Sequence, residues 1–195
     1  MNLLIAAKII WAIGVVGWYV IRIPFEQKVK RERVVDARDR LRELLLLACS
    51  TCGLGIVPLL WATSHVFDVA NYPYTPLQFA LGTLAFIGSL WLFRRTHKDL
   101  GKNWSVTLEI KDKHKLITGG VYRYVRHPMY SAFFLWALAQ LILIPNWIAG
   151  PAGFIGFGIL FAFRVGREEA MMLDTFGDEY RAYMARTARI VPGVL

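Results

Sequence analysis

The sequence has few acidic residues and almost no cysteine. Its 195 residues contain 14 Asp and Glu against 23 Lys and Arg, which gives a net charge of +9. Two cysteines exclude a scaffold held by several disulfides, and 56% hydrophobic residues exclude a disordered chain. Only 19% of the residues are charged and the mean hydropathy is +0.42, which is more apolar than a typical soluble domain. A nucleic-acid-binding protein would share the basic excess, so the positions of the charges must decide the class.

Charge is missing from four long stretches. They are Leu3–Ile21 (apart from Lys8), Leu44–Ala62, Leu77–Phe93 and Ser131–Phe163. A helix that crosses the hydrocarbon core of a membrane needs about 20 apolar residues, so each of the first three stretches predicts one span. The fourth has 33 residues and is interrupted by Pro145-Asn146. It predicts a helical hairpin, Tyr130–Ile144 and Trp147–Phe163. The fold class expected is an all-α integral membrane protein with about five transmembrane helices.

Basic residues gather in the segments that would lie on one side of the membrane. Arg22–Glu43 holds eight, residues 94–126 hold nine and residues 164–195 hold five, whereas Ser64–Pro76 and the hairpin turn hold none. Since basic loops stay in the cytoplasm, we expect the N-terminus outside and the C-terminus in the cytoplasm, although Lys8 mildly opposes this orientation. No small-x-small site follows Ile21, so a cleaved signal peptide is not expected. The positive charge then reflects topology and a face toward anionic lipid, with no nucleic-acid partner.

The chain divides into an N-terminal membrane part, residues 1–93, and a second part, residues 94–195, that contains the hairpin and two polar segments. In the first polar segment, Trp104–Ile110 alternates loosely and is expected to be extended. In the second, apolar residues recur every three or four positions from Leu173 to Met184, which predicts an amphipathic helix to about Arg186. Gly177 is expected to kink it.

Two short polar motifs lie where the chain enters and leaves the predicted hairpin. Arg126-His127-Pro128-Met129-Tyr130 stands at the entry, and Arg164 with Glu168-Glu169 stands at the exit. Both motifs should therefore lie at the same cytoplasmic interface. Arg164 and Glu168 are four residues apart, so they share a helix face. Taken singly, each has a simple structural explanation, as a snorkelling anchor or a surface ion pair.

Together the motifs resemble the isoprenylcysteine carboxyl methyltransferase family. The similarity covers about residues 90–190 and keeps the order and spacing of the segment Asp99–Tyr122, the Arg-His-Pro-x-Tyr motif, Arg164-x-x-x-Glu168-Glu169 and Phe176-Gly-Asp-Glu-Tyr180. The first two spans match only in being apolar. Arg-His-Pro-x-Tyr alone also occurs in phospholipid methyltransferases and, more loosely, in membrane sterol reductases.

The resemblance implies a cytoplasmic pocket for S-adenosylmethionine that is covered by a C-terminal amphipathic helix. The family positions that line this pocket correspond to His114, Lys115, Leu116, Ile117, Tyr122, His127, Pro128, Met129, Tyr130 and Glu168. Arg164 corresponds to the position that faces the acceptor carboxylate. Aromatic side chains and a carboxylate suit a sulfonium cofactor, and a guanidinium can hold a carboxylate with two hydrogen bonds.

The expected function is therefore methylation of a lipophilic, prenylated carboxylate acceptor by S-adenosylmethionine, with membrane lipid as surroundings and no obligate protein partner evident. An amine or thiol methyltransferase of the same superfamily remains open, as do an NADPH-dependent membrane reductase and a protein that kept the fold without catalysis.

Phosphate loops, dinucleotide fingerprints and Ser/His/Asp sets do not stand out. Cys49 and Cys52 lack a second pair for a metal site and are expected to be small buried residues, and Gly14, Gly17, Gly53 and Gly55 to permit close helix contacts.

Overall fold

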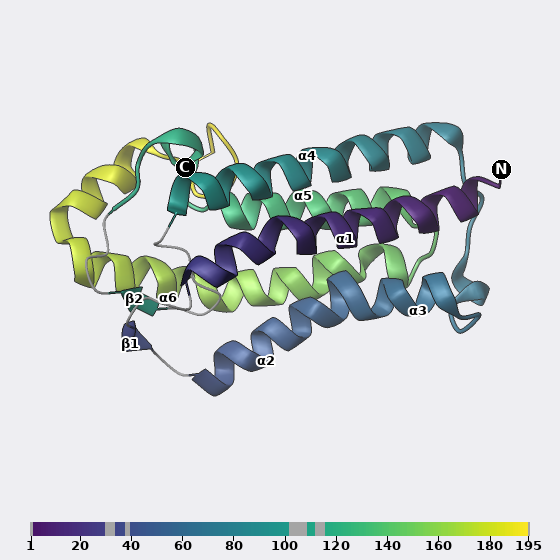
Figure 1. Ribbon diagram of the computed structural model, residues 1–195, viewed down its shortest axis with the longest axis horizontal. Coiled ribbons are helices and arrows are strands. Elements are labelled where there is room, and N and C mark those ends of the chain that lie inside the picture. The colour runs from purple at the N-terminus through teal and green to yellow at the C-terminus, as the bar shows by residue number, and fades with distance from the viewer. Residues whose placement is uncertain (1, 30–33, 38–39, 102–108, 112–115, 195) are drawn as a thin grey trace.

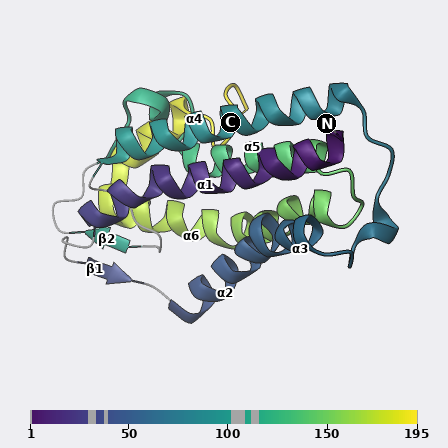
Figure 2. The ribbon, with the colours of Figure 1, turned by 45° about the vertical axis from the view of Figure 1, so that its right-hand side comes forward.

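The computed structural model describes residues 2–29, 34–37, 40–101, 109–111 and 116–194 of the chain. The long helices within these residues are α1 (Leu3–Val29), α4 (Pro76–Leu100), α5 (Pro128–Leu143) and α6 (Ala149–Arg186). A further helical rod consists of α2 (Arg40–Thr51), the π-helical turn η1 (Cys52–Ile56) and α3 (Val57–Thr63). These rods lie side by side along the long axis of the molecule (Figure 1, Figure 2). They occupy the predicted spans, and α5 and α6 form the predicted hairpin.

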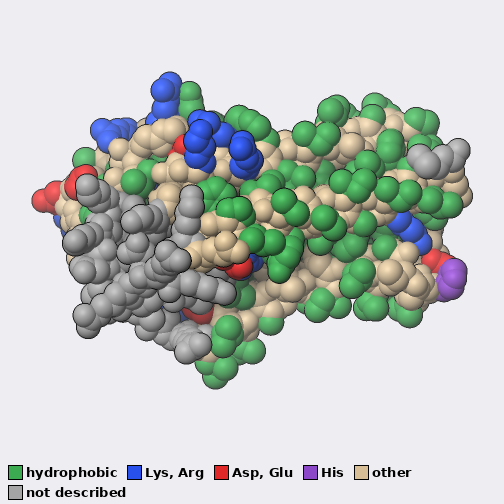
Figure 3. Space-filling view, in the orientation of Figure 1, with side chains coloured by type: hydrophobic (Ala, Val, Ile, Leu, Met, Phe, Trp, Pro, Cys, Tyr) green, Lys and Arg blue, Asp and Glu red, His purple; other side chains and the backbone are tan. Residues whose placement is uncertain are grey.

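Four rods have the length and composition needed to cross a membrane. They are Leu3–Gln27, Leu41–Thr63, Pro76–Leu100 and Ala149–Arg186. The 16 residues of α5 cover about 24 Å, somewhat less than the hydrocarbon core. Apolar side chains cover much of the outer surface of the bundle (Figure 3), and Val16, Leu84 and Ile155 are more than 60% exposed. Such a surface suits lipid, and the all-helical integral membrane fold is confirmed.

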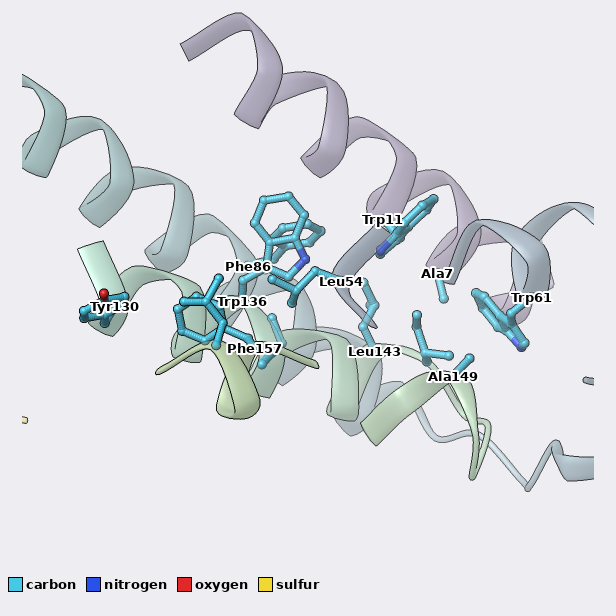
Figure 4. Close-up of a cluster of buried hydrophobic side chains, with 14 of the residues drawn as sticks. Ala7, Trp11, Leu54, Trp61, Phe86, Tyr130, Trp136, Leu143, Ala149 and Phe157 are labelled. Atoms are coloured by element: carbon cyan, nitrogen blue, oxygen red, sulfur yellow. The ribbon is translucent and has the colours of Figure 1, made fainter. Parts of the chain in front are cut away.

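Aromatic side chains fill the middle of the bundle. Trp11, Phe86, Trp136 and Phe157 come from α1, α4, α5 and α6 and lie in one buried cluster (Figure 4). The rings of Phe86 and Trp136 have centroids 4.9 Å apart. Because water is absent from a membrane core, this packing is what holds the helices in their places.

Two glycines bring the second rod against α6. A Cβ atom on Gly53 would lie 2.2 Å from the carbonyl oxygen of Ala152, and one on Gly156 would lie 2.6 Å from that of Cys49. The predicted close contact is therefore confirmed at Gly53. It is wrong at Gly55, where a Cβ would meet nothing within 4 Å.

The first rod also uses one glycine of its predicted pair. A Cβ on Gly14 would lie 2.2 Å from the ring of Phe86, whereas one on Gly17 would make only an ordinary contact with Leu90 at 3.4 Å.

The burial predicted for the two cysteines is wrong. Cys52 is exposed and Cys49 is half-buried, because Gly53 turns the packed face of the helix toward α6 and leaves Cys52 on the outside.

The polar segments add short elements at one end of the bundle. β1 (Val34–Ala37) pairs antiparallel with β2 (Glu109–Lys111) to form a small two-stranded sheet beside the helices. The expected extended segment is confirmed at Glu109 and Ile110, while Trp104 lies outside the described residues. A 3-10 turn, η4 (Gly120–Arg123), leads toward α5, and a second, η2 (Asp68–Ala70), lies at the opposite end.

The predicted C-terminal helix is a continuation of α6. It ends at Arg186, as expected, and Gly177 interrupts it with φ 53° and ψ −123°. A residue with a side chain rarely adopts this left-handed φ, so glycine is needed there. Beyond the kink the chain turns back over the end of the bundle, toward α4 and α5 (Figure 1). This return brings the C-terminal segment onto the Arg126–Tyr130 motif.

Candidate active site

The C-terminal segment pairs with the chain that enters α5. The amide of Arg126 donates to the carbonyl of Ala188 at 2.8 Å, and the amide of His127 donates to that of Arg189 at 3.0 Å. The hydroxyl of Ser131 donates to the carbonyl of Ile190 at 2.6 Å. Pro128 is the first residue of α5, where the missing N–H of proline costs no helical hydrogen bond. These contacts fix the Arg126–Tyr130 motif in one orientation.

Glu169 is the hub of a buried ion cluster. Its carboxylate accepts from Nε of Arg126 at 2.8 Å and from Nη2 of Arg189 at 2.7 Å, and it lies 3.2 Å from Nε2 of His127. Glu169 is only 5% exposed, so it depends on these cations for its charge. We did not expect this role from the sequence, although the Glu168-Glu169 pair pointed to the location. Arg189 lies in a segment without a motif, so no signal marked it.

Glu168 faces the opposite side of His127. Its Oε2 accepts from the hydroxyl of Tyr130 at 2.7 Å, and its Oε1 lies 3.5 Å from Nδ1 of His127. The side chain of Glu168 is 31% exposed, unlike its neighbour Glu169. One carboxylate is thus locked into the protein, and the other is held in place but reachable from outside.

His127 is held between the two carboxylates, and its protonation follows from them. Burial alone would lower the pKa of His127, but the hydrogen bonds and charges of Glu168 and Glu169 raise it above 6.5. The two carboxylates therefore stabilise the charged form of the ring, in which both nitrogens are donors. This His is a link between Glu168 and Glu169.

Arg164 lies one helical turn before Glu168, and α2 supplies its partner. Nε of Arg164 is 3.4 Å from Oε2 of Glu43, a carboxylate that is only 2% exposed. Next to this pair, Nη2 of Arg42 donates to the carbonyl of Phe163 at 3.3 Å. Two adjacent residues of α2 therefore contact two adjacent residues of α6. Glu43 was missed, although a single acidic residue at the start of an apolar run, after eight basic ones, was a usable signal.

Tyr122 is buried beside these groups. Its carbonyl accepts from the hydroxyl of Tyr183, at 2.5 Å, which ties the end of α6 to η4. Burial raises the pKa of the Tyr122 hydroxyl, so it stays protonated. The carboxylate of Asp99, at the end of α4, accepts from the amide of Val121 at 2.9 Å. A Cβ on Gly120, which has φ 61°, would lie 2.2 Å from Oδ2 of Asp99.

Of the other residues predicted to bind the cofactor, the structure describes four and leaves two outside its described ranges. Pro128 is buried, and Met129, Leu116 and Ile117 are half-buried. His114 and Lys115 lie outside the described residues. Among the residues that the structure describes, no three His, Cys, Asp or Glu side chains gather closely enough to hold a metal ion.

Comparisons with known proteins find relatives over the second half of the chain. A profile of the isoprenylcysteine carboxyl methyltransferase (ICMT) family matches residues 81–174. Protein-S-isoprenylcysteine O-methyltransferase of Dictyostelium discoideum is 33% identical over 100 residues, which are 48% of this chain and 40% of the relative. Enzymes of the same name from Schizosaccharomyces pombe and Homo sapiens are 37% and 33% identical over 40% and 46% of this chain, and 34% and 32% of their own lengths. The chain spans less than half of the length of these curated relatives.

A solved structure shares the fold. It is that of the eukaryotic intramembrane Ras methyltransferase ICMT, with a TM-score of 0.52 and 24% sequence identity over 83% of this chain and 55% of that one. At this identity the likeness shows the fold alone. The range that the family profile matches, residues 81–174, contains both Arg164 and Glu168. Over residues 81–174, the chain is therefore similar to the isoprenylcysteine carboxyl methyltransferase family.

Proposed function

We propose that this protein transfers a methyl group from S-adenosylmethionine to the carboxylate of a lipophilic, prenylcysteine-like acceptor. The observation that carries the proposal is the pairing of Arg164 and Glu168, one turn apart at the end of an apolar bundle. One is a cation that suits an acid, and the other is a partly exposed anion that suits a cationic donor. The sequence relatives are named for this class of reaction.

The side chains around Glu168 fit the cofactor. Its carboxylate is held by Tyr130 and His127 but is still 31% exposed, so it can meet a positive group from outside. Tyr130 adds an aromatic wall together with Phe161, whose ring centroid is 5.3 Å away. By the family resemblance, Tyr122, Pro128, Met129 and the segment 114–117 complete the pocket. A donor held there by Glu168 and Tyr130 would supply the methyl group, and the neutral thioether of S-adenosylhomocysteine would be the leaving group.

Arg164 would orient the acceptor. A carboxylate is already ionised at neutral pH, so the reaction requires no general base, and alignment with the methyl carbon is the main requirement. The planar guanidinium of Arg164 can hold the acceptor carboxylate through two hydrogen bonds. A lipid-soluble tail can stay among the apolar helices while its acid reaches this interface.

Arg164 also discriminates between the acceptor classes. An amine acceptor, as in phospholipid methylation, would bring a second positive charge to this side chain when protonated. An NADPH-dependent reductase would have to accommodate a doubly charged 2′-phosphate close to Glu168. Both are less favourable than an anionic acceptor with a cationic donor.

Calorimetry on the detergent-purified protein tests the proposal. S-adenosylmethionine should bind saturably, NADPH should not, and a prenylcysteine acid should then be methylated while its methyl ester is not. Binding of NADPH without a response to S-adenosylmethionine would replace the methyltransferase with the reductase. A folded protein that binds neither would be a non-catalytic member of the fold.

The active end would face the cytoplasm, with the C-terminus inside and the N-terminus outside. The basic residues of Arg22–Glu43, residues 94–126 and residues 164–195 support this orientation. Lys8 mildly opposes it, because its ammonium lies at the opposite end, 5.2 Å from the ring centre of Trp61. A C-terminal reporter that is active only in the cytoplasm should be active. Activity of a periplasm-type or lumenal reporter at that position would reverse the orientation.

A further inference from the structure

The α2 helix contributes a charged residue to the candidate site from outside the family region. Glu43 lies in the first turn of α2 and is 2% exposed, while residues 81–174 hold the motifs that match the family. Neither carboxylate oxygen has a hydrogen-bond partner among the described residues. Its interaction there is the ion pair with Nε of Arg164 at 3.4 Å.

A buried carboxylate at this position requires an explanation. Removing a carboxylate from water costs several kcal/mol, and a lone ion pair often fails to offset that cost compared with a well-packed apolar pair. An apolar residue at position 43 would continue the run Leu44–Leu47 into the lipid-facing helix. Glu43 is therefore poorly explained by stability, and its contact with Arg164 suggests a role at the site.

The direction of the contact indicates what that role is. Glu43 approaches the Nε side of the guanidinium in an ion pair at 3.4 Å without a hydrogen bond, so its charge draws the group toward α2 from the side of its stem. Beside it, Arg42 donates to the carbonyl of Phe163, a solvent-exposed contact that does not involve the Arg164 guanidinium. A long side chain such as Arg loses much rotational freedom when it is held in this way, and that loss is then incurred before the acceptor arrives.

We propose that Glu43 is a positioning residue that holds the Arg164 guanidinium in the orientation in which it receives the acceptor carboxylate. The proposal rests on the proposed function, because it assigns Arg164 to that acceptor. Glu43 also balances the charge of Arg164, so that the site is not a general trap for anions. The pair then favours a carboxylate that arrives with the correct geometry over other anionic lipids.

The variant Glu43→Gln tests this proposal, because it keeps the size of the side chain and removes its charge. We expect kcat to fall about 10- to 100-fold, the cost of a loosely held reacting group, while the affinity for S-adenosylmethionine stays within twofold. Glu43→Asp keeps the charge and should recover part of kcat. Arg42→Gln is the matched control, since it weakens the same contact between α2 and α6 without touching Arg164, and it should leave kcat within about twofold.

A binding measurement separates this proposal from the proposed function. The affinities for a prenylcysteine acid and for its methyl ester are compared in the wild type and in each variant, without any need for turnover. Glu43→Gln should reduce the preference for the acid at least fivefold, and Arg42→Gln should not. If Glu43→Gln alters only the melting temperature, with kcat and acid preference unchanged, the pair is structural and the proposal is wrong. If the wild type binds the acid selectively but never methylates it, the proposed reaction fails and the role of Glu43 is judged by the preference alone.

Discussion

Replacing Arg164 by alanine should destabilise the protein because Glu43 remains behind in the bundle. Both side chains are at most 10% exposed, and their closest atoms are 3.4 Å apart. Removing one member of a buried ion pair costs about 3–5 kcal/mol, because the other charge is left without compensation. For a chain of this size that corresponds to a melting temperature lower by roughly 6–20 °C.

The reverse change should cost less. In Glu43→Gln the guanidinium of Arg164 stays charged, but its long stem lets it turn toward the polar interface at the end of α6. We expect a smaller loss than in Arg164→Ala, because the guanidinium that remains can be solvated at the interface whereas the buried carboxylate cannot. The double variant Glu43→Gln/Arg164→Ala carries no orphaned charge. It should therefore be more stable than Arg164→Ala by about 2 kcal/mol, although it contains one more substitution.

Thermal melts of the four proteins in one detergent, followed by far-ultraviolet circular dichroism, measure this double-mutant cycle. Arg42→Gln serves as a control for general weakening of the contact between α2 and α6. Strictly additive losses, with the double variant the least stable of the four, would refute the charge-pair reasoning. The cycle also decides how catalysis is assayed, because loss of methyl transfer in Arg164→Ala is informative only if the protein is folded. The double variant then provides the cleaner test of the guanidinium.

Three further outcomes follow from the same geometry. Glu168→Ala should weaken S-adenosylmethionine binding, measured by titration calorimetry, at least tenfold. The folded Arg164 variant should still bind the cofactor but lose methyl transfer. Equal loss of binding in both variants would contradict the division of roles. Because Glu168 and Glu169 raise the pKa of His127, its contribution to stability is present below pH 6.5 and is lost as pH rises through the raised pKa. His127→Gln should therefore flatten the fall of melting temperature above pH 6.5. Gly120→Ala should cost about 1–2 kcal/mol in the same melts because of its φ of 61° and the nearby Asp99, while Gly119→Ala, with open space at its Cβ, should be nearly neutral. An equal loss at both glycines would contradict the last expectation.

Hydropathy predicted the fold well because each membrane span must satisfy its own backbone and keep charged side chains away from lipid. The interruption at Pro145-Asn146 located the hairpin, and the apolar spacing from Leu173 to Met184 located the return helix. The same reasoning failed for Cys52 and Gly55, because hydropathy does not say which side of a helix meets lipid and which meets another helix. The pairing of β1 with β2 was also invisible, since neither strand has enough alternation to be recognised alone.

The sequence by itself determined the membrane class, the order of the spans, and the clustering of Arg164, Glu168, His127 and Tyr130, because these depend on local composition and on helical spacing. Only the tertiary structure decided which partners these groups have. Glu43 precedes Arg164 by 121 positions, and Arg189 follows Glu169 by 20. Neither separation is a helical or strand spacing that would predict a contact. Packing of α2 on α6, and the turn at Gly177, bring those charges together. A buried ion needs a counterion nearby in space, and the linear sequence does not show which residue that counterion will be.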